Sequence, residues 1–94
     1  MSISRSETLI KGRWYSEKGR LVADKECERI NRLISSYLQK IATDPSGWGS
    51  LYKDPEDGRY WELTYPQSEL HGGGPPQLRE TSIEEARERY DDLS

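Results

Sequence analysis

Residues 47–66 read GWGSLYKDPEDGRYWELTYP and carry the clearest fold signal in the chain. Two runs rich in Tyr, Trp and Leu flank the segment DPEDG, residues 54–58. In such a segment the proline presets one backbone dihedral and the glycine accepts a positive one. The stretch therefore predicts a β-hairpin.

The second strand of this hairpin has an inward and an outward face. Alternation places Trp61 and Leu63 on the face toward the core and points Glu62 outward. A glutamate on an open sheet face commonly pairs with neighbouring cations, here Arg59 and Lys53. We expect such an exposed pair to contribute less than about 1 kcal/mol.

The segment before the hairpin, DKECERINRLISSYLQKIATD, has the spacing of an amphipathic helix. Asp24 is placed to cap its first amides, and two glutamates follow at the positive end of the helix dipole. Because proline and glycine follow in TDPSG, we expect the helix to end near Ala42. Its apolar face comprises Cys27, Ile30, Leu33, Ile34, Tyr37, Leu38 and Ile41.

Further strands are expected on both sides. LIKGRWY, residues 9–15, and the short run at residues 21–23 suit a first hairpin that turns at Gly19. After Pro66 a loop leads to QLRE, which suits one more strand, and SIEEARERY then carries a capping box that predicts a short helix. The expected class is α+β, a small antiparallel sheet of hairpin-linked strands packed with one long and one short helix.

Length and composition limit the kind of protein. The 94 residues carry a net charge of -3 and are 32% hydrophobic without any Phe, so we expect one domain, residues 1–94, with the tryptophans inside. Residues 1–7 and 91–94 are expected to be flexible tails. The acidic balance argues against nucleic acid as a partner, and the lack of a signal peptide or membrane span predicts a cytoplasmic protein. Cys27, the single cysteine, is expected to be a buried, inert thiol.

Residues 71–74 form the string HGGG, which esterases use to build an oxyanion hole. A hydrolase of that type also needs a G-x-S-x-G nucleophile elbow, and this sequence has none. The glycines could form an anion-binding nest, but they precede an expected strand rather than a helix. We therefore interpret the segment as a structural loop.

Other candidate sites are incomplete. DPEDG lacks the acidic spacing of a calcium loop. The aromatic residues near the hairpin alternate with carboxylates, which favours core packing over nucleic-acid stacking. His71, the only histidine, could work with Glu62 or Glu69 in a small hydrolase or metal-dependent enzyme, although no full set of catalytic roles is visible. We expect no catalytic residue, metal or cofactor.

A longer string, GWGSLYKDPEDGRYWELTYPQSELHGGGPPQL at residues 47–78, resembles bacterial immunity proteins of polymorphic toxin and contact-dependent inhibition systems. It is similar in particular to the immunity protein 27 family, and LIKGRWY and DKECERINRL fit the same pattern. The resemblance implies a non-enzymatic cytoplasmic protein that binds a cognate toxin domain and blocks it.

This implied partner gives the sequence a contact hypothesis. We expect a monomer that forms a one-to-one complex, and the acidic balance would suit a basic toxin such as a nuclease. A general protein-binding adaptor is the remaining alternative. The candidate toxin-binding residues are acidic or polar positions at the hairpin turn, in the glycine loop and on the last helix: Glu56, Asp57, Glu69, His71, Glu84, Glu85 and Glu88.

Overall fold

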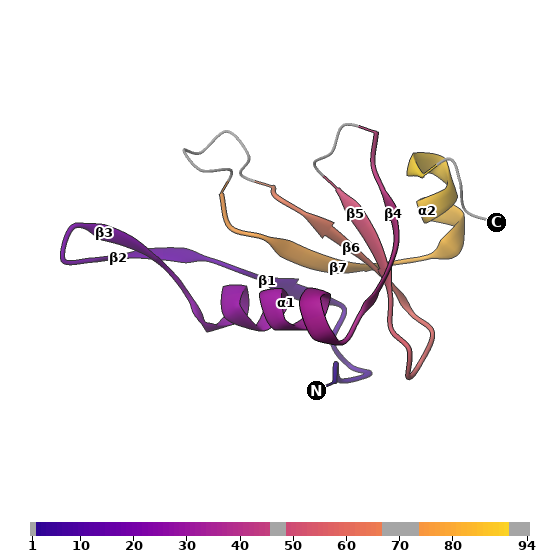
Figure 1. Cartoon of the computed structure of the whole chain (residues 1–94), viewed down its shortest axis with the longest axis horizontal. Helices are drawn as coiled ribbons and strands as arrows, with labels where there is room; N and C mark the ends of the chain where they lie inside the picture. Colours follow the sequence, from indigo (N-terminus) through magenta and orange to yellow (C-terminus); the bar gives the residue numbers. More distant parts are fainter. Residues whose placement is uncertain (1, 46–48, 67–73, 91–94) are drawn as a thin grey trace.

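The computed structural model describes residues 2–45, 49–66 and 74–90, which confirm the α+β class (Figure 1). A five-stranded antiparallel sheet has the order β1-β7-β6-β5-β4, and β2 and β3 form a separate two-stranded ribbon. Along the chain, the described elements are β1 (Leu9–Lys11), β2 (Trp14–Glu17), β3 (Arg20–Ala23), α1 (Lys25–Ser36), β4 (Gln39–Thr43), β5 (Ser50–Lys53), β6 (Tyr60–Thr64), β7 (Gln77–Thr81) and α2 (Ile83–Arg89).

β5 and β6 form the predicted hairpin, with Tyr52 opposite Trp61. At the turn, the Asp54 amide donates to the Arg59 carbonyl at 2.8 Å, and the Gly58 amide donates to the Asp54 carbonyl at 2.9 Å. Gly58 has a φ of +78°, in the left-handed region that glycine adopts at little cost. The turn chemistry of DPEDG is therefore confirmed.

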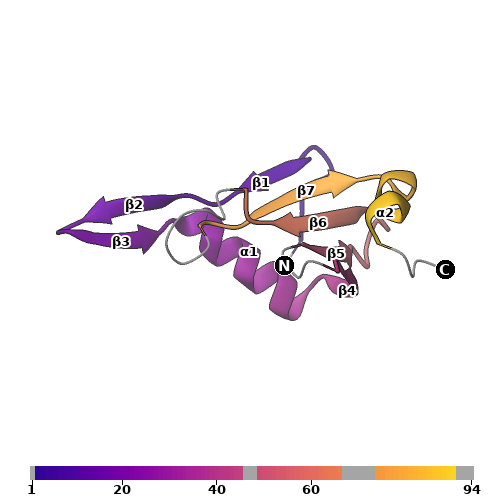
Figure 2. The same cartoon turned by 90° about the horizontal axis from the view of Figure 1, so that it is seen from above.

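α1 covers one face of the sheet and closes the larger core (Figure 2). It begins as predicted, because the Asp24 carboxylate accepts a hydrogen bond from the Cys27 amide at 2.9 Å. Ile30 and Leu33 are fully buried and belong to the same cluster as Trp61. Burial of one such aliphatic side chain stabilises the fold by roughly 1.5–3 kcal/mol.

The predicted end of the first helix was wrong. α1 ends at Ser36, and residues 39–43 form β4, paired with β5 at the sheet edge. Near the end of α1, the Ser35 hydroxyl donates to the Asn31 carbonyl at 2.7 Å, a local bond typical of residues that weaken helices. β5 offers the next residues a hydrogen-bonding ladder, irregular only between Lys40 and Ala42, and this pairing outweighs their helical spacing. As a result Ile41 is 42% exposed instead of facing the core.

The outward placement of Glu62 was also wrong. Glu62 does lie on the face opposite Trp61, but α2 covers that face, and Glu62 is only 3% exposed. A second, smaller core forms there from Leu51, Ala86 and Tyr90. α2 begins as predicted, with the Ser82 hydroxyl accepting from the Glu85 amide at 3.1 Å. The short helix thus turns the expected solvent face into an interior.

The first predicted hairpin is split. β1 pairs with β7 across the main sheet, and only β2 and β3 form the hairpin that turns at Gly19. The break falls at Gly12, whose amide donates to the Pro76 carbonyl at 2.9 Å. A Cβ at Gly12 would lie 2.6 Å from Cys27 Sγ and 2.8 Å from that carbonyl oxygen. A glycine is required here for close packing rather than for a turn.

The N-terminal segment, expected as a tail, packs against the body. Ile3 is 6% exposed and belongs to the larger core, and Ser4 and Glu7 make the polar contacts described below.

Of the tryptophans, Trp61 is fully buried, as predicted, Trp14 is half-buried, and Trp48 lies outside the described residues. Cys27 is a buried free thiol, as predicted. Among the described residues, neither helix is long and apolar enough to cross a membrane.

Candidate functional site

The hairpin turn carries the first two predicted contact residues, and the structure separates their roles. Glu56 is exposed. The Asp57 carboxylate instead accepts hydrogen bonds from the Arg59 amide at 2.9 Å and from Arg59 Nε at 2.7 Å. Burial acts to raise the pKa of Asp57, but the hydrogen bonds and charge of Arg59 outweigh it and hold that pKa below its usual value. Asp57 is therefore committed to the turn, whereas Glu56 is exposed and its carboxylate also interacts with the Tyr37 hydroxyl.

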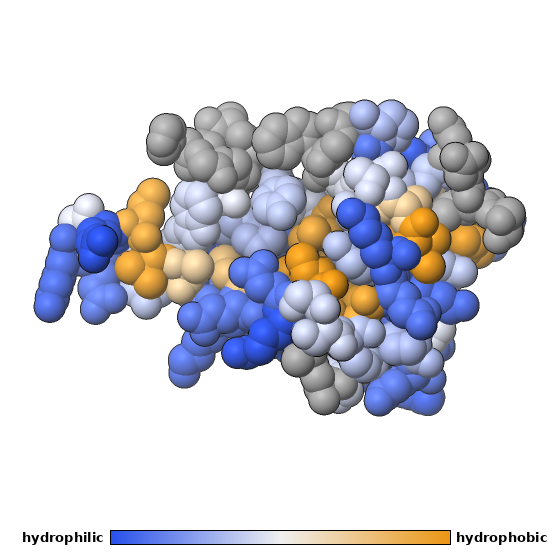
Figure 3. All heavy atoms as spheres, viewed as in Figure 1, coloured by the Kyte–Doolittle hydropathy of each residue, from blue (hydrophilic) through white to orange (hydrophobic). Residues whose placement is uncertain are grey.

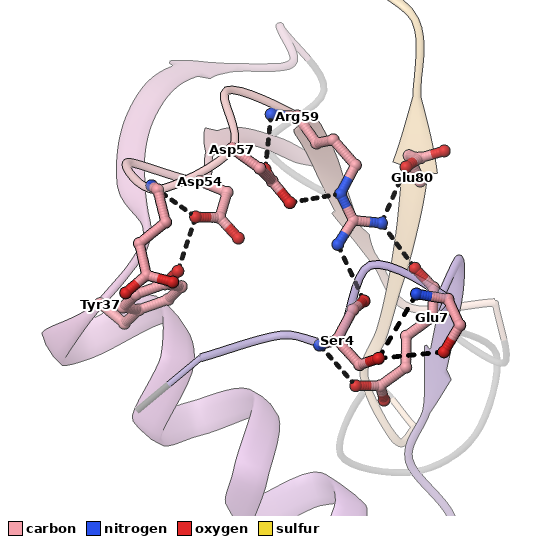
Figure 4. Close-up of polar contacts among 9 residues, drawn as sticks. Ser4, Glu7, Tyr37, Asp54, Asp57, Arg59 and Glu80 are labelled. Carbon is pink, nitrogen blue, oxygen red and sulfur yellow. Dashed lines mark hydrogen bonds and ion pairs between the residues drawn. The ribbon is translucent and has the colours of Figure 1, made fainter.

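Arg59 connects this turn to distant parts of the chain (Figure 4). Its Nη1 donates to the Glu7 carbonyl at 2.7 Å and to Glu80 Oε1 at 2.9 Å, and its Nη2 donates to the Ser4 carbonyl at 3.0 Å. The guanidinium also stacks over the Trp61 ring, 4.9 Å from its centroid. This replaces the predicted ion pair of Arg59 with Glu62.

Neighbouring contacts complete the fixed frame of the turn. The Tyr37 hydroxyl, just past α1, donates to Asp54 Oδ1 at 2.6 Å, which also accepts from the Glu56 amide at 2.8 Å. Burial and the hydrogen bond to Asp54 raise the pKa of Tyr37 well above its usual range. The turn therefore presents Glu56 from a backbone that several elements hold in place.

The second group of predicted contact residues lies on α2. Glu84, Glu85 and Glu88 are all exposed. Since Thr81, at the end of β7, pairs with Tyr60 at the start of β6, α2 begins at the same end of the sheet as the hairpin turn. The predicted acidic residues thus form two groups, Glu56 at the hairpin turn and three glutamates on the helix that starts from the same end of the sheet (Figure 1). Glu69 and His71 lie outside the described residues.

Beneath α2 lies a buried polar cluster that the sequence did not indicate. Glu62 Oε1 accepts from Arg89 Nη1 at 2.6 Å, and Oε2 accepts from the Tyr90 hydroxyl at 3.0 Å. Arg79, on β7, adds a weaker ion pair with Glu62 at 3.7 Å. Burial, together with the bond to Glu62, raises the pKa of Tyr90 well above its usual range. The phenol therefore stays a neutral donor to the carboxylate.

The polar cluster opens into a shallow hollow of about 390 Å³. Asp44, Gly49, Glu62, Thr64, Tyr65 and Arg89 line it. Both oxygens of Glu62 already accept hydrogen bonds from α2 or from the residue after it, so this carboxylate is engaged in positioning the helix. In the part of the chain that the structure describes, no three His, Cys, Asp or Glu side chains are grouped to hold a metal ion.

The enzymatic alternatives pair Glu62 with Glu69 or His71. The proposed partners of Glu62 in a hydrolase, Glu69 and His71, lie outside the described residues. Gly74, the last glycine of the HGGG string, and Pro75 after it are buried and lead toward β7, whereas residues 71–73 lie outside the described residues.

Comparison with known families decides the wider identity. The family model named Immunity protein 27 matches residues 16–82, more than two thirds of the chain. The chain belongs to the immunity protein 27 family. No curated protein and no solved structure matches it.

The immunity protein 27 match has a definite extent in the fold. It runs from β2 through β7 to the N-cap of α2, and so includes the hairpin turn, Arg59 and Glu62. α2, with Glu84, Glu85 and Glu88, lies beyond it, as does the N-terminal segment. The family model therefore covers most of the main sheet together with α1, whereas the N-terminal segment with β1 and the C-terminal helix α2 lie outside it.

Sequence reasoning missed Arg59 and Arg89 as organising residues. Arg59 follows Asp57 by two positions, so the local half of its bonding was accessible from the turn pattern. Its contacts with Ser4 and Glu7, however, join residues more than fifty positions apart. Arg89 could be assigned to Glu62 only once α2 was known to lie over that face of the sheet.

Proposed function

We propose that this protein neutralises a cognate toxin domain by binding it in a one-to-one complex in the cytoplasm, with the acidic end of the molecule in contact. Membership of an immunity protein family supports toxin binding as the function. The acidic end consists of exposed side chains at the hairpin turn and on α2: Glu56, Glu84, Glu85 and Glu88.

One observation carries the choice of this surface. The acidic side chains of α2 lie outside the range that the family model matches, on a helix held against the body by a buried network. Discrimination between related toxins requires contact residues that differ between family members, so an element outside the matched range suits that role. Exposed carboxylates at the rim of an interface mainly accelerate capture of a basic partner.

The proposed partner is a basic toxin, such as a nuclease, because its charge would complement this acidic surface. We propose that the inhibitor is a monomer and acts without a cofactor. Glu69 and His71 remain proposed contacts on the same grounds as in the sequence. The enzymatic and adaptor alternatives receive no support from a particular feature of the described residues.

Co-expression with the C-terminal domain of the protein encoded immediately upstream, as the candidate toxin, tests the proposal. We expect the protein to restore growth and to co-purify with that domain. Reversing α2 with Glu84→Lys, Glu85→Lys and Glu88→Lys together should slow association at least about tenfold at low salt. The matched control is Glu28→Lys, an exposed glutamate on α1.

Two results would contradict this proposal in different ways. If the wild-type protein neither rescues growth nor binds the domain, toxin neutralisation itself is wrong. If the wild type protects and the α2 variant associates as fast as Glu28→Lys, the acidic end is not the contact surface. The melting temperature of each variant separates loss of binding from loss of fold.

A further inference from the structure

The β2–β3 ribbon projects away from the rest of the molecule in both views (Figures 1 and 2). We call residues 14–23 the arm. Its turn is tight, because Lys18 and Gly19 both have positive φ, 51° and 78°, as in the hairpin turns whose twist matches that of the strands. The arm gives the molecule a longest extent of 47 Å, against 29 and 20 Å along the other axes.

Apolar side chains are exposed on both faces of the arm. Leu21 is 70% exposed, and Tyr15 is 48% exposed. Tyr15 lies opposite Val22, whereas Leu21 lies opposite Ser16, one position along β2 from Tyr15. Since directly paired residues share a face and neighbours alternate, Tyr15 and Leu21 point to opposite sides of the ribbon. Figure 3 shows hydrophobic atoms on the arm at a distance from the main body.

This exposure is costly for a structure of this kind. A two-stranded ribbon is marginally stable alone in water and gains stability when its apolar side chains are covered. A flat partner would cover one face of the arm and leave the other in water. A concave partner that receives the arm between two walls would cover both faces.

The charge around the arm differs in sign from that of the rest of the chain. Residues 11–25 contain five basic and two acidic side chains, a net charge of +3. The remaining residues contain nine basic and fifteen acidic side chains, a net charge of -6. The five cations, Lys11, Arg13, Lys18, Arg20 and Lys25, are all exposed.

We propose that the arm inserts into a cleft of the toxin domain that has an apolar floor and a rim of carboxylates. The proposal rests on the proposed function, since it identifies a second contact with the same partner. The concave shape of this cleft is inferred from the apolar side chains exposed on both faces of the arm. The carboxylates at its rim are inferred from the five exposed cations around the arm. The arm anchors the complex, and the acidic end contacts a separate, basic region of the toxin.

The test measures binding of the upstream-encoded toxin domain to purified arm variants. Leu21→Asp and Tyr15→Asp should each weaken the equilibrium affinity by roughly 30-fold or more, as for central interface residues. The matched control is Ile41→Asp, which places the same charge at an exposed aliphatic position on β4, outside the arm. It should bind within about threefold of wild type. Because Leu21 and Tyr15 are exposed, their variants should melt close to wild type.

A second pair of variants addresses the charge. Lys18→Glu with Arg20→Glu should slow association and reduce its sensitivity to salt, because fewer cations then face the carboxylate rim.

A further variant, Leu21→Ser, removes the apolar contact without adding the charge that Leu21→Asp introduces. Loss of affinity in Leu21→Ser supports an apolar floor in the cleft.

Several outcomes would overturn the inference, and each is distinct from failure of the proposed function. If wild type protects and the Leu21 and Tyr15 variants bind as tightly as Ile41→Asp, the arm is not a toxin contact. If the free protein sediments as a dimer that Leu21→Asp dissociates while toxin binding is retained, a second copy of this chain covers the arm. If wild type does not bind the domain, both proposals fail together.

Discussion

The two faces of the five-stranded sheet are covered by helices in different ways. Beneath α1 the interface is apolar, with Ile30 and Leu33 packed in the same cluster as Trp61. Beneath α2 the interface is smaller and has the carboxylate of Glu62 at its centre, bonded to Arg89 and Tyr90. Trp61 and Glu62 are neighbours in the sequence, so one strand contributes to both kinds of interior.

This difference teaches how each helix is held. α1 has twelve residues and buries a broad stripe, so non-directional packing stabilises it. α2 has seven residues, too few to be stable alone, and few buried apolar side chains. Directional hydrogen bonds donated to Glu62 by Arg89 and Tyr90 therefore help to fix where α2 lies. The position of the glutamates on α2 consequently depends on the polar contacts of Glu62.

The most damaging single change should be on the α1 face. Trp61→Ala removes a fully buried ring, with loss of its transfer free energy and creation of a cavity. We expect the free energy of unfolding to fall by about 3–5 kcal/mol, measured by urea denaturation. Trp14→Ala, at a half-buried position on the arm, serves as a control and should cost much less. An equal loss in the two variants would contradict the assignment of the main core.

The α2 face should respond to a smaller change in a different manner. Glu62→Ala leaves the buried Tyr90 hydroxyl without its acceptor, which costs about 1–3 kcal/mol of unfolding free energy. Tyr90→Phe in the Glu62→Ala background removes that orphaned hydroxyl and should recover part of the loss. A double-mutant cycle with urea denaturation measures the coupling.

The double-mutant cycle can also contradict the conclusion that hydrogen bonds hold α2 whereas apolar packing holds α1. If the two substitutions are additive within about 0.5 kcal/mol, the Glu62–Tyr90 bond does not couple β6 to the end of α2. Apolar packing of Leu51, Ala86 and the Tyr90 ring, together with the Arg89–Glu62 ion pair, would then hold α2 without that hydrogen bond. If α2 contacts the toxin as proposed, binding by the Glu62→Ala variant under conditions where it remains folded reports whether α2 has moved.

Sequence reasoning predicted elements whose signals are local. The β5–β6 hairpin follows from the turn chemistry around Gly58, and α2 from the Ser82 capping box, because the atoms involved are a few residues apart. The start of α1 at Asp24 follows for the same reason. These elements needed no knowledge of the partner strand.

The errors share a physical cause, which is competition from distant residues. Residues 39–43 fit a helical spacing, yet β5 supplied the ladder that made them a strand. Glu62 was placed correctly on the face away from Trp61, but whether that face meets water depended on α2, encoded more than twenty residues later. For the site, exposure of Glu56 and of the glutamates on α2 was predictable from charge, whereas the distant contacts of Arg59 with Ser4, Glu7 and Glu80 were not.

The smallest predicted effect concerns the ion pair of Arg29 with Glu7, which links α1 to the N-terminal segment. The Arg29 guanidinium donates to both oxygens of Glu7, at 2.6 and 2.8 Å. Hydrogen bonds from Arg29 lower the pKa of Glu7 from its ordinary 4.5 to about 2. Since the pair is only partly buried, with the Glu7 side chain 29% exposed, we expect Glu7→Gln to cost about 1 kcal/mol or less at pH 7.

The pH dependence of that loss distinguishes the ion pair from simple packing. In the unfolded chain Glu7 binds a proton near its ordinary pKa, whereas the folded chain resists protonation until about pH 2. The stabilisation is thus complete above about pH 5 and disappears as pH falls toward 2. Urea denaturation across this range should show the wild type and Glu7→Gln converging in acid, with Glu28→Gln, on the exposed side of α1, as control. If the unfolding free energies of wild type and Glu7→Gln differed by the same amount at every pH, Glu7 would contribute through packing. The contact between α1 and the N-terminal segment would then resemble the apolar interface beneath α1.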